Sequence, residues 1–269
     1  MKRFVFAISL LAMGGCMVGS DALSYKEFKA QATLEPDTGI YIMNGDEIVV
    51  DEAAMFDIYQ RYLESTYDAM DDGYSTVEQG LIVNLAGGRD DRWPQATASN
   101  LTFCIDAGSF GSRYTSVVNA ITSATGAWEG TANVNFAHSS QYDSSGCNNR
   151  NNNVIFNVRQ VQTSQYLARA FFPSSSRRSR EILVSASSFG NISPWTLAGV
   201  LRHELGHTIG FRHEHTRPES GTCFEDNQWR ALTAYDSASV MHYPQCNGTN
   251  KGDLVLTNLD KTGAHSLYP

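Results

Sequence analysis

The chain has 269 residues, enough for one large domain and a smaller additional segment. Hydrophobic residues account for 42% of the chain and charged residues for 18%, a composition typical of a globular protein. The formal net charge of −8 argues against nucleic acid as the main partner.

Residues 1–22 predict an export signal. A start with two positive charges precedes an apolar run at 4–13 that is too short to span a membrane. Small residues before Cys16 resemble a bacterial lipoprotein signal, in which Cys16 becomes lipidated, although methionine stands where leucine is usual at the third position before it. The alternative is ordinary cleavage after Ala22. Membrane contact is therefore expected only through a lipid anchor at Cys16.

Residues 23–92 form an N-terminal region of different character. Asn44-Gly45-Asp46 separates two apolar runs, which predicts a hairpin. Apolar residues at helical spacing then predict a helix; they are Phe56, Tyr59, Leu63, Tyr67 and Met70. The glycine- and charge-rich stretch at 87–92 predicts an exposed, cleavable linker.

A second domain is expected at 93–269. Short strands are predicted at 101–105, 134–136, 154–158 and 182–185, and a short closing helix at 257–267. A long helix is predicted from a stripe of apolar residues: Tyr114, Val117, Val118, Ile121, Ala124 and Trp128.

Residues 203–213 carry the pattern HExxHxxGxxH within a predicted helix. Ser193-Pro194 is typical of a helix start, with serine as the N-cap and proline in the first turn. Apolar residues then recur every fourth position, at Leu197, Leu201, Leu205 and Ile209. This stripe lies opposite the histidines, so one face is expected in the core and the other at a metal.

Each fixed position of the pattern has a chemical reason. His203 and His207 lie one helical turn apart and can reach one zinc ion at about 2.0–2.1 Å. Gly210 permits the left-handed backbone that ends the helix and returns His213 as a third ligand. Glu204, beside the first ligand, can take a proton from a water activated at the open fourth position.

The segment from Tyr235 to Pro244 resembles the methionine turn of metzincin zinc peptidases. With the strings HELGHTIGFRHEHTRPE and SVMHYP, residues 93–269 resemble astacins and, more closely, the bacterial dual-action HEIGH metallopeptidases. The resemblance implies an α+β fold in which a twisted mixed sheet packs on an active-site helix. It also implies that Met241 supports the zinc site and that Tyr243 is a fifth ligand or stabilises the oxyanion.

The same resemblance bears on two acidic residues. Asp46 resembles the propeptide aspartate that occupies the zinc in astacins, so residues 23–92 are a candidate propeptide; the alternative is that Asp46 only shapes the hairpin turn. Glu214 matches the astacin glutamate that contacts the mature N-terminus; the alternative is a surface carboxylate near Arg212 or Arg217.

Five cysteines are present, and setting Cys16 aside leaves four. In an exported protein these suggest two disulfides, with three pairings open. We favour Cys104–Cys147 and Cys223–Cys246, because the second pair would close the loop between the zinc helix and the methionine turn.

The sequence thus predicts an exported bacterial zinc endopeptidase, either extracellular or a lipoprotein of the outer membrane or cell surface. It is expected to act on proteins or peptides as a monomer with one zinc ion. Two other functions stay open: a zinc hydrolase of cell-wall amides, and a binding lipoprotein with a catalytically silent zinc cleft. The remaining histidines, expected on the surface or in packing rather than at the metal, are His138, His215, His242 and His265.

Overall fold

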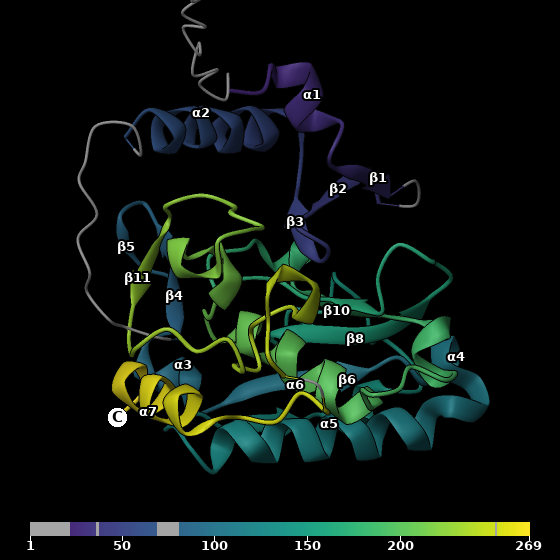
Figure 1. Cartoon of the computed structure of the whole chain (residues 1–269). Coiled ribbons are helices and arrows are strands. Elements are labelled where there is room, and N and C mark those ends of the chain that lie inside the picture. Colours follow the sequence, from purple (N-terminus) through teal and green to yellow (C-terminus); the bar gives the residue numbers. More distant parts are fainter. Residues whose placement is uncertain (1–21, 36–37, 69–80, 251) are drawn as a thin grey trace, which may run out of the picture.

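The computed structural model describes residues 22–35, 38–68, 81–250 and 252–269 (Figure 1). Residues 1–21 of the predicted signal, including Cys16, lie outside them, as does Met70 of the predicted N-terminal helix. Within the described ranges, no helix is both long and apolar enough to cross a membrane.

The N-terminal region folds as a small unit of its own. Helix α1 (Tyr25–Lys29) leads into an antiparallel sheet of β1 (Thr33–Glu35), β2 (Ile40–Met43) and β3 (Glu47–Val49), followed by α2 (Glu52–Asp68). The predicted hairpin is confirmed, with positive φ at Asn44 and Gly45 in its turn. Figure 1 shows this unit, in purple and blue, above the body, with the β2–β3 turn reaching down into it.

The body is built on a five-stranded mixed sheet. In spatial order its strands are β7 (Phe136–His138), β6 (Leu101–Ile105), β8 (Phe156–Val161), β10 (Glu181–Ser185) and β9 (Ala168–Arg169). All neighbours pair in parallel except β9, which is an antiparallel edge strand. The predicted strands at 134–136 and 154–158 therefore exist but begin two residues later than expected.

Two long helices, α5 (Tyr114–Glu129) and α6 (Leu197–Thr208), pack against each other beneath this sheet (Figure 1). The main core between sheet and helices includes Trp128, Leu201 and Leu205, each fully buried. The predicted α+β architecture, with a twisted mixed sheet on an active-site helix, is confirmed.

Residues 87–92 are not the linker that was expected. Strand β4 (Ile82–Ala86) pairs with β11 (Trp229–Ala231) and, through a tight turn, with β5 (Arg89–Asp90). Gly87, Gly88, Arg89 and Arg92 are exposed, but Asp91 is 5% exposed and accepts hydrogen bonds from the backbone and hydroxyl of Ser174. Apolar packing places Leu81 and Val83 in the main core, so this segment belongs to the body.

Short helices complete the body. Three α-helices are α3 (Gln95–Ala98), α4 (Ala107–Phe110) and α7 (Asn258–Leu267), the last capped by Thr257. Single turns of 3₁₀ helix lie at Gly111–Arg113, Ser140–Tyr142, Arg177–Ser179, Ala186–Phe189, Glu214–Thr216, Pro218–Ser220 and Pro244–Cys246.

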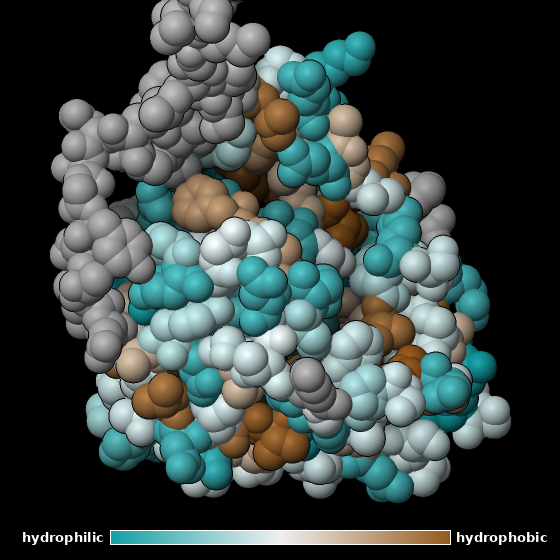
Figure 2. All heavy atoms as spheres, viewed as in Figure 1, coloured by the Kyte–Doolittle hydropathy of each residue, from teal (hydrophilic) through white to brown (hydrophobic). Residues whose placement is uncertain are grey.

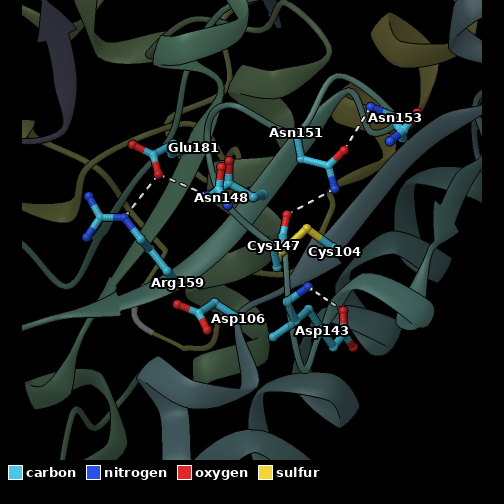
Figure 3. Close-up of a disulfide and its surroundings, with 12 residues drawn as sticks. Cys104, Asp106, Asp143, Cys147, Asn148, Asn151, Asn153, Arg159 and Glu181 are labelled. Carbon is cyan, nitrogen blue, oxygen red and sulfur yellow. Dashed lines mark hydrogen bonds and ion pairs between the residues drawn. A yellow bond between two sulfur atoms is a disulfide. The ribbon is translucent and has the colours of Figure 1, made fainter.

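Both favoured disulfides form. Cys104–Cys147 ties β6 to the asparagine-rich loop that follows the 3₁₀ turn Ser140–Tyr142, where Asn151 bonds the Gly146 carbonyl (Figure 3). Cys223–Cys246 joins the loop after α6 to the segment after the methionine turn, as predicted.

The face drawn in Figure 2 carries hydrophobic residues in separate small groups among hydrophilic and neutral ones. Scattered exposed apolar residues are normal for a soluble domain, so this face offers no single apolar patch that calls for a partner.

Candidate active site

Helix α6 begins later than the sequence suggested. The Ser193–Pro194 bond is cis and precedes the helix, and Thr196 is the N-cap, its hydroxyl accepting from the Gly199 backbone. The cap also bonds Asp253 through its backbone and hydroxyl, which ties the helix start to the C-terminal segment.

The helix passes very close to the methionine turn. A Cβ placed on Gly206 would lie 2.4 Å from Met241 Sδ and 3.1 Å from the Trp128 ring, so only glycine fits there. Met241 itself is fully buried, next to the helix at Gly206. Its support role stays a prediction, and the glycine that makes room for it was not anticipated.

Gly210 ends the helix as predicted. Its φ is +100°, and a Cβ would lie 2.1 Å from the Asp91 carbonyl oxygen. The chain then turns against β4: the Gly210 carbonyl accepts from the Asn84 backbone, and the Arg212 backbone donates to Ile82. These bonds fix the direction in which His213 leaves the turn.

The three motif histidines converge, and each has its tautomer fixed. In every case Nδ1 lies 2.7–2.8 Å from an oxygen that can only accept, so in the neutral ring Nδ1 carries the proton and Nε2 the lone pair. The acceptors are the carbonyls of Val240 and Phe211 and the carboxylate of Glu225. All three Nε2 atoms are buried without a hydrogen-bond partner, which is the arrangement of a metal site.

Asp46 lies at the point where the histidines meet. Its Oδ2 is 3.3 Å from His203 Nε2 and 3.6 Å from His207 Nε2, and its Oδ1 is 3.1 Å from His213 Nε2. The carboxylate is 4% exposed although it sits in a hairpin turn. Three imidazoles and one carboxylate within ligating range of a single point suit zinc, which takes four nitrogen and oxygen ligands.

Burial and charge shape the acidity of the site. Burial lowers the pKa of His203 to about 4. Burial would also lower the pKa of His213, but Asp46 and Glu225 raise it well above its ordinary value. Burial opposes ionisation of Asp46, yet the neighbouring His213 and His207 hold its pKa well below the ordinary range.

Glu204 is buried beside the histidines, and its Oε2 has no hydrogen-bond partner. Burial, and next the Asp46 charge, raise its pKa well above the ordinary value. The Tyr243 ring lies 4.5 Å from that of His213, with its hydroxyl beside Gly45. A pocket of about 230 Å³ opens here, lined among others by Asp46, Tyr166, Trp195, Glu204 and Tyr243.

Glu225 is a site residue that the sequence did not reveal. Its Oε1 accepts from His213 Nδ1 at 2.7 Å and lies 3.3 Å from His215 Nε2, while Oε2 pairs with Arg212 at 3.1 Å. No motif marks it, because it follows His213 by twelve residues in a loop without periodicity. His213, His215 and Glu225 also lie close together. In this group His213 is the predicted zinc ligand, and Glu225 and His215 support it.

Glu214 is not the surface carboxylate that was one of two expectations. It is fully buried, and its Oε1 accepts from the Asp236 backbone at 3.0 Å and lies 3.4 Å from Arg217. Its Oε2 has no partner. Burial raises its pKa well above the ordinary value. Of the other histidines, His265 is exposed, His138 bonds Asp143, His242 meets the Tyr235 hydroxyl, and His215 is buried beside Glu225.

A buried three-histidine centre with an adjacent carboxyl, at the end of a helix under a mixed sheet, defines the chain as a metallopeptidase of the kind that binds zinc. Residues 95–250 match the family model described as metallo-peptidase family M12. The match covers more than half of the chain, and the chain belongs to this family.

Two sea-urchin proteins of Strongylocentrotus purpuratus share part of the sequence. A bone morphogenetic protein 1 homolog is 36% identical over 84 residues, and protein SpAN is 32% identical over 81 residues. Each match covers 23% of this chain and 13% of the relative, so the chain spans only a small part of their length.

Among solved structures, myroilysin is similar with a TM-score of 0.49 at 19% identity, covering 70% of this chain and 98% of that one. High choriolytic enzyme 1, a hatching enzyme zinc-protease of the medaka Oryzias latipes, has a TM-score of 0.40 at 19% identity, covering 64% and 92%. Both scores lie below 0.5, so each likeness is partial.

Proposed function

We propose that this metallopeptidase is a zinc endopeptidase of the metzincin type that is made in a latent form. The observation that carries the proposal is the convergence of three buried, unpartnered Nε2 atoms on Asp46 of the N-terminal region. His203, His207 and His213 would hold the zinc ion. Bound there, zinc would supply Lewis-acid polarisation of the scissile carbonyl and lower the pKa of water.

The chain's own residues divide the remaining work. Glu204 takes the proton of the attacking water and passes it to the leaving amine, a role its raised pKa supports. Tyr243 donates a hydrogen bond to the developing oxyanion. Met241 packs beneath the histidines and keeps their spacing fixed.

Asp46 keeps the full chain inactive. Its carboxylate occupies the position that water and substrate need, and Gly45 beside it fills the space in front of Tyr243. Shaping the turn and blocking the site are compatible roles, since the positive φ of Asn44 and Gly45 is what carries Asp46 into the cleft.

Activation then requires removal of the N-terminal region, residues 23–92 in the sequence-based division. The pairing of β4 with β11 moves the expected cut toward the N-terminus, to a point between Asp68 and Leu81. The unpartnered Oε2 of buried Glu214 is a fitting acceptor for the ammonium of a new N-terminus, the role implied by the astacin resemblance.

Export follows from the predicted signal and the two disulfides, which form in oxidising compartments. We extend the proposal to a monomeric extracellular or surface enzyme, anchored where Cys16 is lipidated. The finer kinship with the bacterial HEIGH metallopeptidases rests on the strings around His203 and Met241.

Casein cleavage and zinc content, measured together on full chain activated by limited proteolysis, with and without a chelator, test the reaction. Glu204→Gln should keep stoichiometric zinc and lose turnover by about 10²–10⁴-fold, since a general base contributes that much. His213→Ala should lose zinc. Wild-type turnover in the first variant, or stoichiometric zinc in the second, would contradict the assigned roles.

Latency needs its own variant. Asp46→Asn should cleave casein before any processing, whereas Asp51→Asn, the same change at an exposed position of the same region, should stay latent. If both variants are equally latent, Asp46 only shapes the hairpin turn and does not block the site.

Mass spectrometry of activated protein should find a new N-terminus between Asp68 and Leu81. A new N-terminus near residue 93 would contradict the proposed boundary. Zinc without casein cleavage, but with release of cell-wall fragments, would favour the amide-hydrolase alternative.

A further inference from the structure

The edge strand β9 carries a buried site that holds a carboxylate. Arg169 reaches Glu35 of β1 with two nitrogens, Nε at 3.2 Å from Oε1 and Nη2 at 2.7 Å from Oε2. The Tyr166 hydroxyl donates to the same Oε1. Arg169 is 1% exposed and Glu35 8%, so the contact is fully enclosed. Such two-pronged pairing is selective for the planar carboxylate.

The two halves of this site come from different parts of the chain. Arg169 and Tyr166 belong to the body, while Glu35 lies 134 and 131 residues away in the N-terminal region. Among the described residues, Glu35 is the acid that pairs with Arg169, since the nearby Glu181 is taken by Arg159 and Asn157. When the N-terminal region leaves, the Arg169 guanidinium loses this ion-pair partner.

The site borders the catalytic cleft. Tyr166 lines the same pocket as His203 and Glu204, and its hydroxyl donates to Glu35. Strand β9 forms the free edge of the main sheet and contacts helix α6. An extended peptide that lies along this edge would bring one of its side chains to Arg169.

We propose that Arg169 and Tyr166 form a substrate subsite for a carboxylate, which Glu35 fills in the full chain. This inference rests on the proposed function, because the subsite becomes free only when the N-terminal region is removed. The ligand is either an acidic side chain of the substrate or its terminal carboxylate. Neutral amides of the same size are disfavoured, because they leave the buried guanidinium unpaired.

The site can be tested without catalysis in the full chain. Glu35→Ala leaves room for a small carboxylate, so sodium propionate should raise its thermal midpoint by about 2–4 °C over sodium chloride at equal ionic strength. Wild type, whose site is filled, should not respond, and neither should Glu35→Ala combined with Arg169→Gln. Equal midpoints in the two salts would overturn the carboxylate site.

The substrate role is tested on full chain activated by limited proteolysis. Matched peptides carry Glu or Gln at each position around one scissile bond, and a second set ends in a free carboxylate or an amide. At one position the acid should raise kcat/KM by about tenfold, mainly through KM. The preference should fall in Tyr166→Phe and in Arg169→Lys, which keeps the charge but loses the fork.

Arg159→Lys is the matched control, because Arg159 pairs with Glu181 on the same sheet and does not bond Glu35. A flat profile, or a preference that survives both site variants, would overturn the proposal. If no peptide is cleaved, the proposed peptidase function fails. The effect of propionate on the thermal midpoint of Glu35→Ala still shows whether Arg169 and Tyr166 bind a carboxylate. Whichever peptide set shows the preference identifies the source of the carboxylate.

Discussion

At the scale of single residues, we expect the charge on Glu225 to strengthen zinc binding although Glu225 is not itself a predicted zinc ligand. It holds the proton of His213 on Nδ1 and so keeps the Nε2 lone pair available. Glu225→Gln should weaken zinc binding by about 10–100-fold, the usual effect of losing such a partner. Competition with a chromophoric chelator measures this directly.

Glu219→Gln provides the comparison, since Glu219 pairs with Arg217 in the same loop but does not contact a histidine. Equal zinc affinity in the two variants would show that Glu225 serves only its ion pair with Arg212.

Gly210 should be intolerant of any side chain. Its φ of +100° is strained for alanine, at about 1–3 kcal/mol, and the Cβ would also collide with the Asp91 carbonyl. Gly87→Ala separates the two effects, because Gly87 has a φ of +58° and open space around it. Denaturant unfolding should show a larger loss for Gly210→Ala, and equal losses would mean that the collision is relieved by small shifts.

At the scale of elements, the sequence predicted those elements that depend on neighbouring residues and missed those that depend on contacts between distant parts of the chain. The helix of His203 and the hairpin of Asp46 were predicted because their residue patterns are local. Strand β9 was missed because two residues carry no periodicity, and the role of residues 87–92 was wrong because β4 is held by a strand more than 140 residues later. Glu225 and Arg169 matter only through contacts that the fold creates.

The two disulfides should differ in their effect on activity. Cys223–Cys246 spans 23 residues and joins the loop after His213 to the segment after Tyr243. It therefore restrains the backbone next to two predicted site residues. Cys104–Cys147 spans 43 residues on the far part of the sheet. Chain entropy gives each about 3–4 kcal/mol of stability, slightly more for the longer loop.

Replacing both cysteines of each pair by serine, one pair at a time, separates the effect of each disulfide on activity from its effect on stability. Loss of Cys223–Cys246 should lower kcat/KM severalfold, while loss of Cys104–Cys147 should cost at least as much stability and leave kcat/KM nearly unchanged. A parallel fall of activity and stability in both variants would show that neither bond positions the site.

At the scale of the whole molecule, several contacts join the N-terminal region to the body at the cleft, among them Asp46 at the histidines, Glu47 at Arg212 and Glu35 at Arg169. The Glu35 contact involves no predicted zinc ligand. Burial alone would raise the pKa of Glu35, but the Arg169 guanidinium more than offsets this and lowers it to about 2. Tyr166 also faces this carboxyl, and Arg159 lines the adjoining pocket.

The contact should therefore lose strength in acid. A carboxyl with a depressed folded pKa contributes stability that is fully present above its ordinary value of 4.5 and is lost as the pH falls toward about 2. The difference in thermal midpoint between wild type and Glu35→Gln should be largest at neutral pH and shrink across that interval. Asp57→Asn, an exposed change on α2, should show no such difference. A difference that stays constant down to the lower limit would mean that Glu35 acts through packing rather than charge.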